Sequence, residues 1–140
     1  MEHFFEMLKY ACLAMVSGVH GLVSMLLVIN LSLAAVCTKA WRILSDTSLC
    51  VKLGILLLLP FVILFSGAIL KAPAGHFRSS YEVEPILIYS LFLFDLFLAA
   101  STIYRQKGFR WFASAMCLLI LWFSSLCVML SLIAVPNLFV

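Results

Sequence analysis

The chain has 140 residues, of which 66% are hydrophobic and 11% are charged, and its formal net charge is +3. Soluble domains typically contain about 25% charged residues, so this composition excludes an ordinary soluble domain. The apolar residues form runs of membrane-spanning length, which predicts a single integral membrane domain over residues 1–140. Nucleic acid is not an expected partner, because Lys and Arg stand at the ends of these runs rather than in a basic block.

The apolar runs predict four membrane-spanning helices. The nine residues ahead of the first helix have the pattern of an amphipathic lead-in at the membrane surface. Pro60 falls inside the second helix, where it removes a backbone hydrogen bond and predicts a kink. The expected helices are residues 10–37, 49–70, 86–103 and 111–135. Joined by short loops, they predict an all-α, up-and-down four-helix bundle.

Small residues recur at helical spacing in the first predicted helix. Ala14 and Gly18, and likewise Ser17 and Gly21, are separated by three residues. This small-xxx-small spacing lets two helix backbones approach closely. We therefore expect Ala14, Gly18 and Gly21 to pack against a helix of the same chain, with a homo-oligomer interface as the alternative.

The distribution of basic residues predicts the orientation of the chain. The first and third loops, with their flanks, hold six Lys or Arg residues, whereas the N-terminal segment and the second loop hold three. Because cytoplasmic loops carry the excess of Lys and Arg, both termini are predicted to be non-cytoplasmic. The first loop would then be cytoplasmic, where a disulfide between its flanking residues Cys37 and Cys50 is not expected.

Asp95 is the only charged residue in the predicted helix over residues 86–103. An acid at that depth costs about 2.5–3.5 kcal/mol on insertion scales, so it should face protein or water. His20 lies ten residues after Tyr10, and Asp95 lies nine residues after Ile86. Both side chains are thus expected at similar depth, about 15 Å and 14 Å along their helices. If the two helices touch, an imidazole–carboxylate pair would satisfy both groups.

Three further residues complete the intramembrane candidates. Trp122 lies at comparable depth in the fourth predicted helix and can donate its indole N–H to this pair. Ser17 and Ser24 flank His20 on its own helical face, at i−3 and i+4. No catalytic motif occurs in the sequence, and no catalytic or metal site is predicted.

These residues leave three functions open. The leading hypothesis is a small non-catalytic accessory subunit of a larger membrane complex, such as an energy-conversion assembly, because the sequence has little extramembrane mass. The alternative is a compact proton- or ion-coupled transporter, or a channel-like oligomer, with His20 and Asp95 as coupling groups. The third is a membrane anchor that holds haem or quinone with His20. Membrane lipids and other membrane subunits are the expected partners.

Overall fold

The computed structural model describes residues 2–38, 47–70, 83–106 and 109–134. These residues form five α-helices and, within the described ranges, no strand. Four helices, all except the first, are long and apolar enough to cross a membrane. The helices are α1 Glu2–Val16, α2 Gly18–Cys37, α3 Thr47–Ile69, α4 Val83–Arg105 and α5 Arg110–Ala134. The predicted all-α bundle is confirmed, and its last three spans begin and end within three residues of the expected positions.

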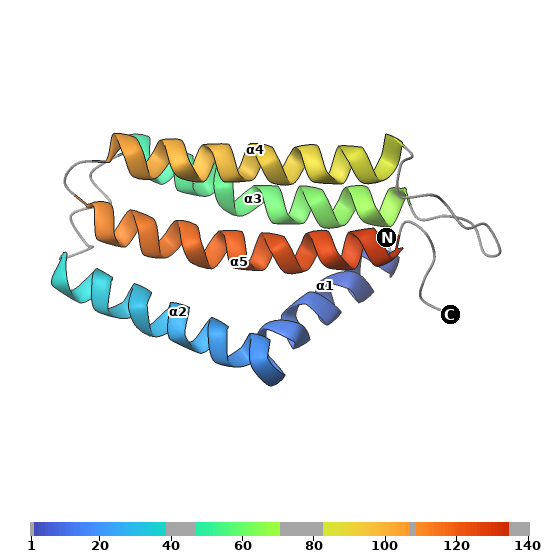
Figure 1. The fold of residues 1–140 in the computed structure, drawn as a ribbon, viewed down its shortest axis with the longest axis horizontal. Coiled ribbons are helices and arrows are strands. Elements are labelled where there is room, and N and C mark those ends of the chain that lie inside the picture. The colour runs from blue at the N-terminus through green and yellow to red at the C-terminus, as the bar shows by residue number, and fades with distance from the viewer. Residues whose placement is uncertain (1, 39–46, 71–82, 107–108, 135–140) are drawn as a thin grey trace.

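The helices run up and down along one long axis (Figure 1). α3, α4 and α5 alternate in direction, and α5 contacts each of the other four helices. α1 and α2 together make one passage along the bundle, with a bend between them. The start of α1 and the end of α5 consequently lie at the same end of the bundle.

The prediction of one continuous helix over residues 10–37 is wrong, because the chain bends at Ser17 and forms two helices there. Ser17 has an extended backbone (φ −103°, ψ 146°), and Gly18 follows with φ +55°. Glycine adopts this left-handed conformation without the steric cost that a Cβ brings. A Cβ on Gly21 would lie 2.5 Å from the carbonyl oxygen of Val16. The two glycines therefore shape a bend. Gly21 meets the end of α1, whereas a Cβ on Gly18 would meet no atom within 4 Å, so the expected packing against another helix of the chain is not seen at Gly18.

Replacing Gly18 with Ala should destabilise the bundle, because a residue with a Cβ pays about 1–2 kcal/mol in the left-handed region. We expect the free energy of unfolding, measured by SDS titration in mixed micelles, to fall by about that amount. Gly18→Asn should cost less, since Asn tolerates this conformation better. Equal stability of the Ala variant and the wild type would show that the bend does not need this glycine.

α1 packs on the bundle instead of lying apart from it as a surface segment. Met7 and Ala11 are buried in an apolar cluster that includes residues of α3 and α5. The rings of Phe4 and Phe65 meet edge to face, with centroids 6.0 Å apart. Ala14, one of the expected packing residues, is half-buried. α1 therefore covers the second halves of α3 and α5.

The described residues form two separate apolar clusters inside the bundle. The first cluster joins α1 to the start of α4 and to the C-terminal halves of α3 and α5. The second cluster joins the N-terminal halves of α3 and α5 to the C-terminal half of α4. α3 continues as one helix through Pro60, which is buried between the two clusters. This arrangement leaves a layer at the middle of the bundle that belongs to neither cluster.

Candidate functional site

The middle layer of the bundle contains a buried acid. On α4, Asp95 stands between Ile88 of the first cluster and Ala99 of the second. Asp95 and Ser124 are both 0% exposed, and the Ser124 hydroxyl donates a hydrogen bond to Asp95 Oδ2. Asp95 Oδ1 has no hydrogen-bond partner among the described residues. The acid thus faces protein, and its bond to Ser124 joins α4 to α5.

A second set of polar residues lies on a different face of α5 from Ser124. The Trp122 indole N–H donates a hydrogen bond of 3.1 Å to Ser24 Oγ, and the ring of His20 lies 5.4 Å from that of Trp122 between centroids. His20 is half-buried, and its Nδ1 has no hydrogen-bond partner among the described residues. Ser17 is not part of this group, because it is exposed at the bend and its carbonyl accepts the N–H of Gly21.

The expected His20–Asp95 pair does not form. Trp122 and Ser124 are two residues apart on α5, so their side chains point about 200° apart around the helix. Trp122 contacts Ser24 and His20 of α2. Ser124 contacts Asp95 of α4. α5 therefore stands between His20 and Asp95. The expectation of similar depth holds, since both groups lie beside neighbouring residues of α5, but the helices that carry them are not packed together.

A close contact between α3 and α5 was not predicted. A Cβ on Gly67 would lie 2.5 Å from the Cβ of Ser131 and 2.9 Å from its Cα. The Ser131 hydroxyl also donates a 3.2 Å hydrogen bond to the carbonyl oxygen of Ile63. The one signal in the sequence was the run of small residues Ser66–Ala68 in an otherwise bulky apolar helix. It marks a place where the backbones of α3 and α5 approach each other closely.

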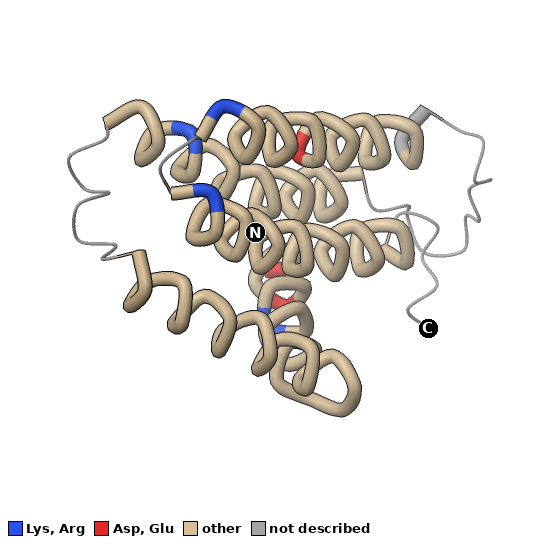
Figure 2. The backbone as a smooth tube through the Cα atoms, turned by 60° about the vertical axis from the view of Figure 1, so that its left-hand side comes forward, with Lys and Arg blue, Asp and Glu red and all other residues tan. Residues whose placement is uncertain are grey.

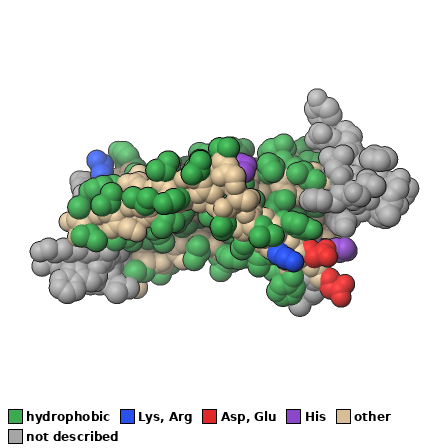
Figure 3. Space-filling model, turned by 90° about the horizontal axis from the view of Figure 1, so that it is seen from below, with side chains coloured by type: hydrophobic (Ala, Val, Ile, Leu, Met, Phe, Trp, Pro, Cys, Tyr) green, Lys and Arg blue, Asp and Glu red, His purple; other side chains and the backbone are tan. Residues whose placement is uncertain are grey.

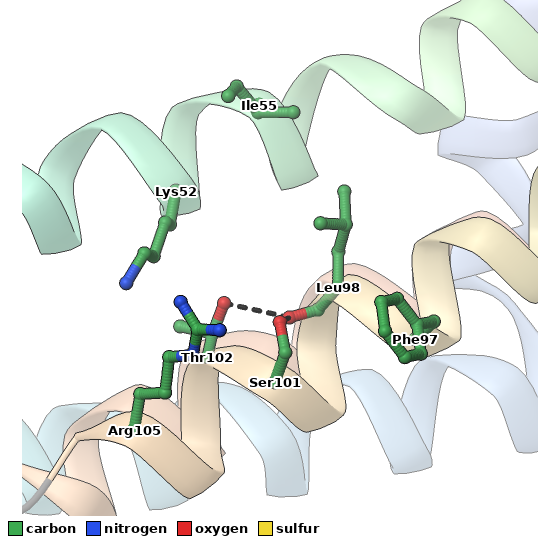
Figure 4. A pocket seen from close by; sticks show the side chains of 7 residues that line it. All are labelled: Lys52, Ile55, Phe97, Leu98, Ser101, Thr102 and Arg105. Atoms are coloured by element: carbon green, nitrogen blue, oxygen red, sulfur yellow. Dashed lines mark hydrogen bonds between the residues drawn. The ribbon is translucent and has the colours of Figure 1, made fainter.

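A pocket of about 280 Å³ lies between α3 and α4, where α3 begins and α4 ends (Figure 4). In the sequence, its two basic residues indicated only the orientation of the chain. The hydroxyls of Ser101 and Thr102 donate hydrogen bonds of 2.9 Å and 2.8 Å to the carbonyl oxygen of Leu98. The lining residues are Lys52, Ile55, Phe97, Leu98, Ser101, Thr102 and Arg105.

The four helices that are long and apolar enough to cross a membrane define a multi-pass helical membrane protein. Within the described ranges, no group of three His, Cys, Asp or Glu side chains could hold a metal ion. Comparisons with protein-family models, curated proteins and solved structures found no match. The function is therefore inferred from the geometry of the chain itself.

Proposed function

We propose that this chain is a small, non-catalytic structural subunit of a membrane assembly. The observation that carries the proposal is how its intramembrane polar groups are used. Ser124 bonds Asp95, and Trp122 bonds Ser24, so each bond links α5 to another helix of the same chain. Catalysis and transport need polar groups that a substrate or ion can reach, whereas Asp95 is fully enclosed. Such groups are suited to hold the bundle in one arrangement.

The surface of α2 supports the proposal. α2 buries only Ser24 and Ala34 among its 20 residues, and one apolar stripe faces outward. Figure 3, which looks onto α1 and α2, shows a surface that is largely apolar, with its charged side chains towards the ends. The stripe consists of Val19, Leu22, Leu26, Ile29, Leu33 and Val36. Their spacing of three and four residues gives a continuous face that fits a helix of another membrane subunit.

Extraction in mild detergent tests this proposal. The tagged chain, purified from its native membrane, should elute with other membrane chains in fixed stoichiometry. Leu22→Ala with Leu26→Ala, on the stripe, should reduce the recovery of these chains. Leu57→Ala with Leu58→Ala, on an exposed part of α3, should not. A chain that elutes alone, is monodisperse and transports a solute would contradict the proposal, and visible absorbance of the eluate would favour the haem anchor.

One observation favours the coupled transporter as a second candidate. Asp95 Oδ1 is buried without a hydrogen-bond partner among the described residues, and acids at membrane depth often mark ion pathways. Flux of protons or cations into vesicles that contain the purified chain tests it. If this candidate is right, Asp95→Asn abolishes flux while the chain still folds. Wild-type flux no greater than that of protein-free vesicles rules it out.

A further inference from the structure

We propose that the pocket between α3 and α4 binds one anionic phospholipid, with the lipid phosphate between Lys52 and Arg105. Lys52 comes from the first turns of α3 and Arg105 from the last turn of α4. Figure 4 shows both side chains reaching towards the same space at one end of the pocket. Within the described ranges, neither forms an ion pair with an acidic side chain.

The charge of this end of the pocket favours an anion. Two cations that converge repel each other, and an anion between them removes that repulsion. The hydroxyls of Ser101 and Thr102 already donate to Leu98, so the ammonium and guanidinium groups are the donors available to a ligand. Phosphate oxygens suit both donors, since a guanidinium binds phosphate with two parallel hydrogen bonds and an ammonium binds it as a point charge.

The apolar part of the pocket favours a lipid over a free phosphate. Phe97 lies eight residues before Arg105 on α4, which is about 12 Å of helix rise away from the cationic end. Ile55 lies one turn beyond Lys52 on α3, in the same direction. The side chains of Ile55 and Phe97 are 50% and 68% exposed, which leaves them open to an acyl chain. A cationic end followed by an apolar wall matches a phosphate headgroup followed by an acyl chain.

The position of the pocket along the bundle agrees with this ligand. Lys and Arg residues stand at the end of the bundle where α3 and α5 begin and α4 ends (Figure 2). The predicted orientation places this end at the cytoplasmic leaflet. That leaflet carries anionic lipids, which attract basic residues beside the membrane.

Native mass spectrometry of the purified full chain tests the proposal, with phosphatidylglycerol and phosphatidylcholine as the added lipids. We expect one phosphatidylglycerol to stay bound under conditions that remove phosphatidylcholine. Lys52→Gln and Arg105→Gln should each weaken its binding about fivefold, because a basic residue at the membrane surface contributes about that factor. Arg110→Gln is the matched control, since Arg110 lies at the same end of the bundle but does not line the pocket.

Two further measurements distinguish a lipid site from a site for free phosphate, and a loss of binding from a loss of folding. Glycerol 3-phosphate has the headgroup phosphate without acyl chains, and it should not displace the lipid. Displacement at equal concentration would show that the pocket binds phosphate alone, which would overturn the lipid proposal. The double variant Lys52→Arg with Arg105→Lys keeps both charges and should keep binding, so it tests the site even if the Gln variants fail to fold. Equal retention of both lipids, or an equal loss in Arg110→Gln, would also overturn the proposal.

Discussion

Replacing Gly67 with Ala should lower the free energy of unfolding by about 2 kcal/mol, because overpacking of a close-packed interface typically costs 1–3 kcal/mol. The added Cβ would meet the Cα of Ser131 at 2.9 Å, as well as its side chain. Rotation of the serine side chain cannot relieve a contact with its backbone, so α3 and α5 must move apart. That movement would also strain the hydrogen bond from the Ser131 hydroxyl to Ile63.

Gly54→Ala is the matched control for this prediction. Gly54 lies on the same helix, and a Cβ there would meet no atom within 4 Å. Ala is a better helix former than Gly by about 0.5–1 kcal/mol, so this variant should be as stable as the wild type or slightly more stable. SDS titration in mixed micelles measures both. Equal effects of the two substitutions would contradict the close contact between α3 and α5.

Replacing Ser124 with Ala should also lower the free energy of unfolding by about 2 kcal/mol. The change removes the hydrogen bond to Asp95 Oδ2, and Oδ1 already has no partner among the described residues. A buried polar group left unsatisfied costs about 1–3 kcal/mol, and more if it is charged. The carboxyl of Asp95 would then lie in an apolar interior with neither oxygen bonded to a described residue.

Ser125→Ala is the control for the loss of a hydroxyl beside this site. The Ser125 hydroxyl donates to the carbonyl oxygen of Trp122 in its own helix, so it links no pair of helices. Its removal should change the free energy of unfolding by less than about 0.5 kcal/mol, as is usual where no such link is lost. If the two serine variants lose equal stability, the hydrogen bond to Asp95 does not stabilise the bundle more than the one within α5.

The four spans and the depth of their polar residues could be predicted from the sequence. Helix length and hydropathy depend on consecutive residues, and the rise per residue then fixes depth, which is why His20 and Asp95 lie at the expected level. Their partners could not be predicted in the same way. Which helices touch is decided by the packing of the whole bundle, and here α5 separates the two residues.

The bend between α1 and α2 is a second feature that could not be predicted from the sequence. The spacing of Gly18 and Gly21 is compatible with close helix packing and also with a break in one helix. The choice depends on the backbone angle at Gly18 and on the carbonyl of Val16 beside Gly21, neither of which a residue pattern reports. Similarly, Lys52 and Arg105 could be assigned to one membrane face, but their convergence on one pocket required the packing of α3 against α4.

The most direct test of the account is a double-mutant cycle between Asp95 and Ser124, measured as free energy of unfolding in mixed micelles. Our central claim is that this pair holds two helices of the chain together. The double variant Asp95→Leu with Ser124→Ala removes both partners, so its loss should be smaller than the sum of the single losses by about 1–2 kcal/mol. Additive losses, together with ion flux that disappears in Asp95→Leu, would contradict the claim and identify Asp95 as a transport residue.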